Sequence, residues 1–320
     1  MKYGFGIDLG GTTVKLAFFD EIGTLLEKWE IPTVTENGGD RILPDIAASI
    51  KEYLQFKAIP ERDILGIGIG VPGPVSRDGT VNRCVNLGWG VFNVEKALSQ
   101  LTGFPVRAGN DANMAALGEC WKGGGRGCSD LLMVTLGTGI GGGILVNGQP
   151  VCGFRGAAGE IGSLCLNRKE TELHASGLRG CAEQYCSATG VVLLAERYLA
   201  ANDAPSRLRQ AEPLTCKAVF DAAGEKDPAA LAVLEQFYAL LGEFLANVCD
   251  VLDPEVVVLG GGVSKAGTQL IEGLRPHFQK RVFHAIGDMP FAIATLGNDA
   301  GAYGAFKLLL DSCYSGFPHK

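Results

Sequence analysis

One local pattern occurs twice in this sequence, and the repetition constrains the fold more than any other feature. The segments YGFGIDLGGTTVKLAFFDEIG and LLMVTLGTGIGGGILVNG each read as an apolar strand, a turn rich in glycine and threonine, a second strand and a tight turn. They lie some 128 positions apart. Two copies of one unit predict a duplicated, two-lobed α/β fold with a cleft between the lobes. The alternative is that two unrelated hairpins share an ordinary pattern.

The length of 320 residues, about twice that of an ordinary domain, also indicates two lobes. We expect an N-terminal α/β lobe of residues 1–110, on which a C-terminal helix at 300–314 packs back. The second lobe is expected at 111–299, with a mainly helical insertion. Further strands are predicted at 64–71, 256–259 and 291–295, and helices at 40–56 (with Asp40 as N-cap), 93–101 and 112–121.

The composition excludes several classes of protein. The chain carries 28 basic and 35 acidic side chains, a net charge of −7, so a nucleic-acid partner, which needs a basic face, is not expected. There is no cleavable apolar leader and no run of ~18 uninterrupted apolar residues, so no membrane partner is predicted. Ten scattered cysteines without a C-x-x-C pair indicate reduced thiols and a cytoplasmic location.

Glycine is the one abnormal component, at 46 residues or about 14%, and it gathers in turns that follow apolar strands. Glycine lets a phosphate approach backbone N–H donors, and threonine hydroxyls add further donors. Asp8, at the end of the first strand, is suited to hold Mg²⁺ through water. The turns lead into strands, so neither the P-loop pattern nor the Rossmann fingerprint is present. The phosphate candidates are Gly10, Gly11, Thr12, Thr13, Thr138 and Gly139.

Eight motifs follow one another between residues 6 and 264: GIDLGGTTVKLAFFD, GIGVPGPV, VNLGW, GNDANMAALGE, VTLGTGIGGGI, GAAGEIG, GCAEQYCSATG and LGGGVS. In these motifs the sequence resembles the ROK family of sugar kinases and repressors, in its bacterial glucokinase branch. That family has the two-lobed ribonuclease H-like fold of the actin/hexokinase/Hsp70-like superfamily. The resemblance implies ATP-dependent phosphorylation of a hexose, foremost glucose to glucose 6-phosphate. It also implies ATP and Mg²⁺ as cofactors and a homodimer.

Other functions stay open at this point. One is a kinase for another hexose, such as N-acetylmannosamine, N-acetylglucosamine or fructose. Another is one of the family's repressors, whose helix-turn-helix precedes the first loop; here the first strand begins at Tyr3, which leaves no room for it. A third is a non-catalytic sugar-binding regulator, against which the retained Asp8, Asp111 and glycine turns argue.

The resemblance assigns roles to single residues. Asp111 matches the family's catalytic aspartate, which accepts the proton of the attacking sugar hydroxyl. From its local sequence alone, Asp111 would cap a helix that begins at Ala112. Lys15 either helps to neutralise phosphate charge or faces solvent from its strand. The glycines of a third loop, Gly260, Gly261 and Gly262, would back the adenine or ribose. The sugar-binding positions are Gly73, Asn86, Asn110, Glu160, Ser163 and Glu183.

The sequence departs from the family in its zinc-binding segment. The four ligand positions are here Ser163, His174, Ser176 and Cys181, and serine is a poor zinc ligand. We therefore expect no structural zinc, and Ser163 leaves the choice of sugar open. A rebuilt zinc site would need Cys165 and Cys186 beside His174 and Cys181. Without zinc, the segment is expected to be packed by four leucines, Leu164, Leu166, Leu173 and Leu178.

Overall fold

The computed structural model describes residues 1–314, and by their contacts these residues form two compact units. The first unit comprises Met1–Ser129, Gly143–Gly159 and the chain from Thr295 onward. The second comprises Asp130–Gly142 and Glu160–Ala294. The chain passes from one unit to the other at each of these boundaries.

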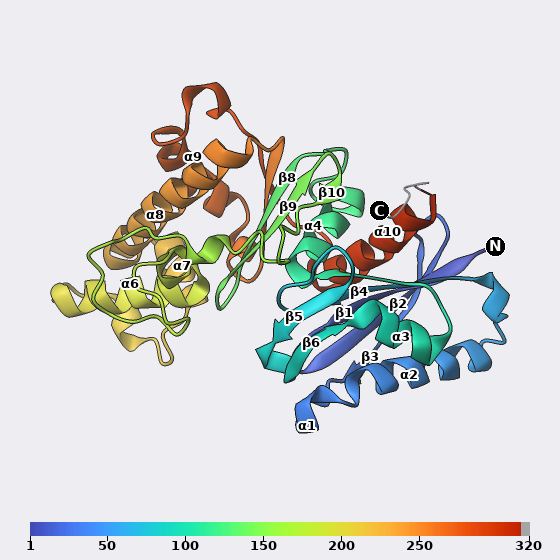
Figure 1. The fold of residues 1–320 in the computed structure, drawn as a ribbon. Helices are drawn as coiled ribbons and strands as arrows, with labels where there is room; N and C mark the ends of the chain where they lie inside the picture. The colour runs from blue at the N-terminus through green and yellow to red at the C-terminus, as the bar shows by residue number, and fades with distance from the viewer. Residues whose placement is uncertain (315–320) are drawn as a thin grey trace. The chain divides into compact units, whose positions relative to one another are not determined.

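The first unit is built on a five-stranded sheet in the order β3-β2-β1-β4-β7 (Figure 1). Strands β1, β2 and β3 are antiparallel neighbours, whereas β1, β4 and β7 run parallel. Of these, β1 and β4 are almost wholly buried apolar runs, as expected of strands covered on both faces, whereas β7 is only partly buried. The five strands are β1 (Tyr3–Leu9), β2 (Thr13–Asp20), β3 (Leu25–Pro32), β4 (Ile64–Val71) and β7 (Val106–Asn110).

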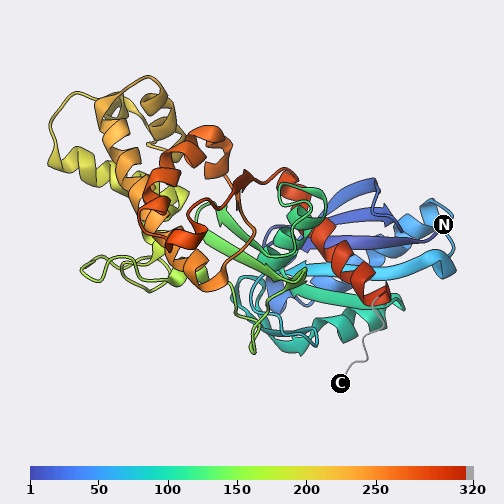
Figure 2. The ribbon, with the colours of Figure 1, turned by 90° about the horizontal axis from the view of Figure 1, so that it is seen from above.

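Helices cover both faces of this sheet. Along β2 the side chains alternate, so that Leu16 and Phe18 join one core and Ala17 and Phe19 another. The first core is shared with two helices and the second with one. Figure 1 shows these helices on opposite faces of the sheet. Figure 2 shows that last helix lying along the sheet. The helices are α2 (Ile42–Phe56) and α3 (Val94–Thr102) on the first face, and α10 (Ala300–Tyr314) on the second.

Two strand glycines allow α10 to lie directly on the sheet backbone. A Cβ added at Gly6 would lie 2.1 Å from the Ala302 carbonyl oxygen, and one added at Gly68 would lie 1.8 Å from that of Ala305. Helix α4 (Asp111–Lys122) packs against α10 and β4 in the same unit. The first contact unit therefore extends past the lobe boundary predicted after residue 110.

A second five-stranded sheet repeats the strand order of the first, as β10-β9-β8-β11-β12. In both sheets a meander in chain order is followed by two strands added beside its first strand, and the added strands run parallel. The duplicated α/β fold predicted from the repeated sequence unit is thereby confirmed, whereas the cleft stays a prediction. The strands are β8 (Leu131–Leu136), β9 (Ile140–Val146), β10 (Gln149–Pro150), β11 (Val256–Gly260) and β12 (Phe291–Ile293).

The second unit also contains the predicted helical segment. Its central helix, α8, is buried along much of its length against its neighbours. Within residues 1–314, α8 is the one helix long and apolar enough to cross a membrane by length and composition. Of its most apolar stretch, 61% is buried, as in a core helix. The helices are α5 (Ala182–Cys186), α6 (Ala188–Ala201), α7 (Cys216–Gly224), α8 (Pro228–Leu252) and α9 (Thr268–Gln279).

Two sequence predictions of local structure need correction. The helix predicted at 40–56 begins at Ile42, and Asp40 is not its N-cap. Asp40, with φ −62° and ψ −24°, ends the preceding turn, and Arg41 stands between it and the helix as the N-cap residue. The sequence analysis also missed β7 and a ribbon formed by β5 (Thr80–Cys84) and β6 (Trp89–Asn93), since these short strands lack regular alternation.

Candidate active site

In the first unit, the ends of three parallel strands bring candidate residues to one edge of the sheet. Asp8 in β1 pairs in register with Gly70 in β4, and Gly70 pairs with Gly109 in β7. Asn110 and Asp111 directly follow Gly109. Ligands of open α/β sheets bind beyond the carboxyl ends of such strands. The register therefore places Asp8 and the Asn110–Asp111 pair at the edge where a ligand is expected.

The first glycine turn joins β1 to β2 beside this edge. The Gly10 N–H donates to the Thr13 carbonyl at 3.0 Å, which closes the turn, and Gly11 and Thr12 are exposed. Asp8 and Lys15 are cross-strand partners, and Lys15 Nζ lies 3.2 Å from Asp8 Oδ2. The turn therefore carries a cation and an anion on the two strands that form it.

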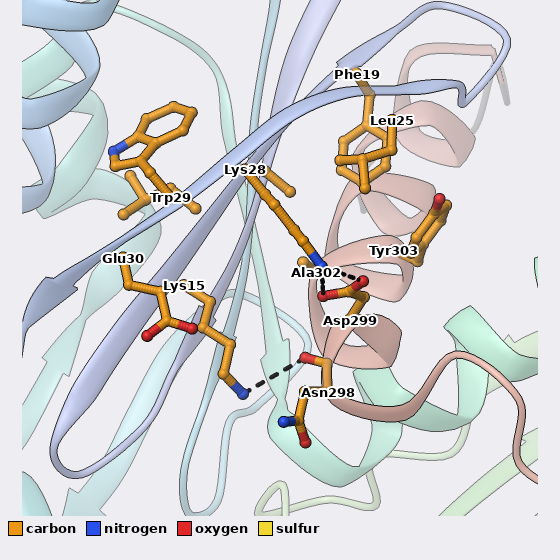
Figure 3. Close-up of a pocket in the computed structure, with 12 residues that line it drawn as sticks. Lys15, Phe19, Leu25, Lys28, Trp29, Glu30, Asn298, Asp299, Ala302 and Tyr303 are labelled. Atoms are coloured by element: carbon orange, nitrogen blue, oxygen red, sulfur yellow. Dashed lines mark hydrogen bonds and ion pairs between the residues drawn. The ribbon is translucent and has the colours of Figure 1, made fainter.

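A cavity of about 290 Å³ adjoins Lys15 on β2 and β3 (Figure 3). Its wall includes Phe19, Tyr303 and Lys28, and the Lys28 ammonium is paired with Asp299 at 2.8 Å. Of the predicted site residues, only Lys15 lines it. The cavity is thus a neighbour of the first turn and not the candidate active site itself.

Asp111 is the first residue of α4, and Asn110 is its N-cap. The Asn110 side chain accepts a hydrogen bond from the Asn113 N–H at 3.1 Å. The interpretation of Asp111 as the cap of a helix beginning at Ala112 is therefore wrong. Asp111 Oδ1 accepts hydrogen bonds from the Ala112 N–H at 2.8 Å and from Asn110 Nδ2 at 2.9 Å. These bonds fix the carboxylate at the start of the helix.

Two further sugar candidates lie near this helix start. Asn110 Nδ2 also donates to the Gly73 carbonyl at 3.0 Å, and Gly73 has a φ of +91°, which favours glycine. Asn86 is exposed in a short helical turn, η2 (Val85–Leu87). The structure brings Gly73, Asn110 and Asp111 into direct contact, and it gives Asn86 no side-chain bond to them.

Cys84 is a residue of this region that the sequence analysis did not identify. Its thiol is buried beneath η2, and burial raises its pKa, with the negative charge of Asp111 acting in the same direction. The Leu87 and Asn86 backbone N–H groups donate to the sulfur and act against the shift. Cys84 thus supports the backbone that carries Asn86. No sequence signal distinguishes it from an ordinary core cysteine.

In the second unit, the second glycine turn contacts Glu183. Glu183 lies in the first turn of α5, and its Oε2 accepts a hydrogen bond from the Ile140 N–H at 2.7 Å. A Cβ added at Gly139 would lie 2.1 Å from the same oxygen. Thr138 is exposed, and its carbonyl accepts a hydrogen bond from Thr189 Oγ1 at 2.7 Å. The structure therefore joins a predicted sugar residue to a predicted phosphate turn.

The other candidates of the second unit lie beside this turn. Glu160 and Ser163 are exposed at the two ends of η3 (Ile161–Ser163), which packs on α5. A Cβ added at Gly162, between them, would lie 2.9 Å from the Ile140 carbonyl oxygen and 3.5 Å from Glu183 Cβ. The structure thus gathers Glu160, Ser163 and Glu183 around the second turn.

The glycine loop after β11 approaches the same turn from another side. Gly261 has a φ of +80°, and a Cβ there would lie 2.5 Å from the Leu136 carbonyl oxygen. Ser264 Oγ donates to the Gly261 carbonyl at 2.8 Å. Gly260 ends the buried strand, and Gly262 has open space around it.

Comparison with known proteins decides the family. The ROK family model matches residues 4–312. The chain belongs to the ROK family. Among its relatives, a glucokinase of Halalkalibacterium halodurans is 41% identical over 95% of this chain and 93% of the relative. An N-acetylgalactosamine kinase of a Shewanella species is 31% identical over 95% of this chain and 96% of the relative.

A solved structure of the ROK family has the same fold. It is a ROK family glucokinase from Streptomyces griseus in complex with glucose and AMPPNP. The TM-score is 0.72 and the identity 30%, over 96% of this chain and 98% of the other.

Residues 163–181 correspond to the segment for which the resemblance to the ROK family implies structural zinc. In this chain their side chains do not fit a metal ion. His174 Nδ1 lies 2.8 Å from Ser176 Oγ and 3.6 Å from Glu183 Oε1, so it already has a hydroxyl and a carboxylate as neighbours. Cys181 and Cys186 are buried, whereas Cys165 is exposed, and burial raises the pKa of the Cys186 thiol. Throughout residues 1–314, no group of three or more histidine, cysteine, aspartate or glutamate side chains is placed to hold a metal.

The predicted packing of this loop by leucines is wrong. Leu164, Leu173 and Leu178 are exposed, and Leu166 is only partly buried. Apolar side chains in contact with water contribute little burial energy. Polar side chains hold the loop instead. The sequence analysis named one of them, His174, whose Nδ1 lies 3.6 Å from Glu183 Oε1, but not the others.

Proposed function

We propose that this chain is an ATP-dependent hexose kinase that converts glucose to glucose 6-phosphate. The observation that carries the proposal is the shared strand edge, where Asp8, beside the first glycine turn, pairs in register with Gly70, and Gly70 pairs with Gly109, two residues before Asp111. Phosphoryl transfer needs a site for the phosphates of ATP close to a group that accepts the proton of the sugar hydroxyl. The 41% identity to a glucokinase over nearly the whole chain supports this assignment.

In the proposed reaction, Asp111 is the general base. Its carboxylate accepts the proton of the sugar hydroxyl while that oxygen attacks the γ-phosphorus of ATP, and ADP leaves. No bond to the protein forms at any stage. The hydrogen bonds from Asn110 and Ala112 hold the carboxylate in one orientation, so that little reorganisation is needed during transfer.

The nucleotide phosphates are assigned to both glycine turns. Gly10, Gly11, Thr12 and Thr13 offer backbone and hydroxyl donors at the first, and Thr138 and Gly139 at the second. The Ile140 N–H is not counted, because Glu183 already accepts its hydrogen bond. Asp8, which is partly exposed, would hold Mg²⁺, and the ion would neutralise charge on the phosphates. Lys15 would add positive charge, and Gly260, Gly261 and Gly262 would line the adenine or ribose.

The hexose is assigned to polar groups that accept and donate hydroxyl hydrogen bonds. In the first unit these are Gly73, Asn86 and Asn110, and in the second they are Glu160, Ser163 and Glu183. The identity of the sugar is the open part of this assignment, because Ser163 stands where the family has histidine. The similarity to an N-acetylgalactosamine kinase favours a kinase for another hexose as the second candidate.

We further propose a cytoplasmic homodimer. Each of the ten cysteines is a free thiol, which suits a reducing compartment. The homodimer is the usual assembly implied by the ROK resemblance. Sedimentation at several concentrations tests it, and a monomer at all of them would contradict it.

A coupled assay of ADP release over a panel of hexoses tests the proposed activity. The panel holds glucose, fructose, N-acetylglucosamine, N-acetylmannosamine and N-acetylgalactosamine, each with ATP and Mg²⁺. We expect the highest kcat/KM with glucose. If only an N-acetylhexosamine is phosphorylated, that sugar replaces glucose as the substrate. If no sugar of the panel supports ADP release, the protein is not a hexose kinase.

A further inference from the structure

The loop of residues 163–181 is closed at its base by backbone pairing. Cys165 and Cys181 form an isolated β-bridge, and the Ala182 N–H donates to the Leu164 carbonyl at 2.7 Å. These bonds join the two ends of the loop. They do not reach its middle, where the exposed leucines supply no core.

Four side chains form one hydrogen-bonded group at the middle of the loop, and we call them the Arg197 cluster. Glu170 and Glu172 belong to the loop, Tyr185 to α5 and Arg197 to α6. Arg197 Nη1 donates to Glu170 Oε2 and Nη2 donates to Glu172 Oε2, each at 2.8 Å. The Tyr185 hydroxyl also donates to Glu170 Oε2. One guanidinium thus ties two loop carboxylates to a helix of the second unit.

The central carboxylate of the cluster is well buried, with 6% of the Glu170 side chain exposed. Hydrogen bonds from Arg197 and then from Tyr185 hold the pKa of Glu170 at about 2. A buried carboxylate persists in its charged form only with such partners. Lysine is no equivalent of arginine here, because a single ammonium lacks the planar fork that reaches two acids.

Tyr185 of the cluster and its neighbour Gln184 also bind the loop to the short helix that carries Glu183. Gln184 and Tyr185 directly follow Glu183 in α5. Gln184 Oε1 accepts a hydrogen bond from the Gly180 N–H at 2.8 Å, and Gln184 Nε2 donates to the Glu172 carbonyl at 3.2 Å. The two residues after Glu183 are therefore both bound to the loop, which leaves the helix little freedom to turn.

We propose that the Arg197 cluster takes the place of the family's structural zinc, and that Arg197 and Tyr185 are positioning residues that hold α5 so that Glu183 meets the hexose. The second part rests on the proposed function, because it requires Glu183 to bind sugar. The first part does not, since it concerns only what holds the loop.

Limited proteolysis tests the first part. Arg168 and Lys169 are exposed in the loop and offer trypsin sites. In Arg197→Met we expect cleavage there at least about 10-fold faster than in the wild type, since local opening controls proteolysis. Arg197→Lys should lie between the two. The control Lys217→Met, which removes an exposed ion pair with Asp221 on α7, should match the wild type. Unchanged cleavage in Arg197→Met would overturn the cluster's role.

Metal dependence completes this test. The wild type should keep its full activity after chelation once Mg²⁺ is restored, and added zinc should not slow cleavage of Arg197→Met. Elemental analysis should find well under one zinc per chain. Activity lost to the chelator and recovered only with zinc would overturn the replacement of zinc by the cluster.

Steady-state kinetics with the hexose of highest kcat/KM tests the second part. Arg197→Met should raise the hexose KM about 10-fold, with kcat and the ATP KM within about 3-fold of the wild type, because loss of orientation weakens sugar contacts first. Tyr185→Phe, which removes only a hydroxyl, should act in the same direction to a smaller extent, and Arg197→Lys should restore part of the loss. Faster cleavage with an unchanged hexose KM would overturn the positioning role. If the wild type phosphorylates no hexose, the proposed function fails, while proteolysis still decides the cluster.

Discussion

The two glycine turns stand at equivalent places in two sheets of the same strand order, yet their surroundings differ. At the first turn, a Cβ added at Gly11 would meet nothing within 4 Å, and the flanking strands carry the Asp8–Lys15 pair. At the second, Gly139 lies against Glu183, which accepts the Ile140 N–H. The first turn is thus open with charges of its own, whereas the second is partly occupied by a carboxylate from α5.

This difference suits a division of roles in which the first turn binds phosphate and the second orients a sugar-binding carboxylate. A turn with exposed glycine and threonine beside an acid and a lysine suits a phosphate and its metal ion. A turn that holds a carboxylate in place suits the orientation of that carboxylate toward sugar hydroxyls. Under the proposed function, the first unit would supply the base and the carboxylate for Mg²⁺, and the second would supply both sugar carboxylates, Glu160 and Glu183.

The largest expected effect is that of Asp111→Asn, because it removes the proposed base from the first unit. We expect kcat to fall by ~10²–10⁴-fold, with the hexose KM changed by less than about 3-fold. Asp45→Asn, at a partly exposed residue of α2 that pairs with Arg41, is the matched control and should keep the wild-type rate. Turnover of Asp111→Asn at the wild-type rate would show that Asp111 is not the base.

Glu183→Gln should show the opposite kinetic pattern, because it alters the second unit. A charge-assisted hydrogen bond contributes ~1.5–3 kcal/mol, so its loss should raise the hexose KM by about 10- to 100-fold, while the ATP KM stays near the wild-type value. Initial rates over both substrates measure this, with Glu196→Gln on the exposed face of α6 as control. A rise in the ATP KM alone would contradict the assignment of Glu183 to the sugar and would place it at the nucleotide.

Lys15→Met should have a smaller effect, on the nucleotide side only. A partly exposed charge contributes ~0.2–1 kcal/mol, which corresponds to a rise in the ATP KM of up to about 5-fold. The hexose KM should not change. If instead the hexose KM rose and the ATP KM did not, Lys15 would belong to the sugar side of the comparison.

The last prediction concerns stability at acid pH, and it leaves the two glycine turns unchanged. The pKa of Glu170 is lowered from its ordinary value of 4.5 to about 2, so the contribution of the Arg197 cluster is complete above pH 4.5 and is lost as the pH falls toward 2. Arg197→Met should be less stable than the wild type by about 1–2 kcal/mol at pH 7. Thermal unfolding from pH 7 to pH 2.5 should show this gap closing. A gap that stays constant across that range would contradict the role of the Glu170 carboxylate.

Much of the fold could be predicted from the sequence because its strands are buried apolar runs that end at glycine. Strand β4 was predicted with the bounds that the structure has, and the repeated unit predicted the duplicated sheet. Short irregular strands such as β7 could not be predicted, since they lack alternation and are defined by their neighbours in the sheet.

The candidate site was less predictable, because its contacts join distant parts of the chain. Motifs identified Asp111 and Glu183, but not the bond between Glu183 and Ile140, which are 43 residues apart. The Arg197 cluster left no signal either, since a glutamate and an arginine 27 residues apart look like ordinary surface charges. Only the fold shows which polar side chains share one buried place.

The divided tasks of the two turns are tested most directly by glucose binding to two alanine variants, measured by calorimetry without nucleotide. In Gly139→Ala the new Cβ would lie 2.1 Å from Glu183 Oε2 and must displace it, whereas in Gly11→Ala it meets nothing within 4 Å. We expect Gly139→Ala to bind glucose about 10- to 100-fold more weakly than the wild type and Gly11→Ala to bind it within about 2-fold. Equal glucose affinity in the two variants, or a larger loss in Gly11→Ala, would contradict the account.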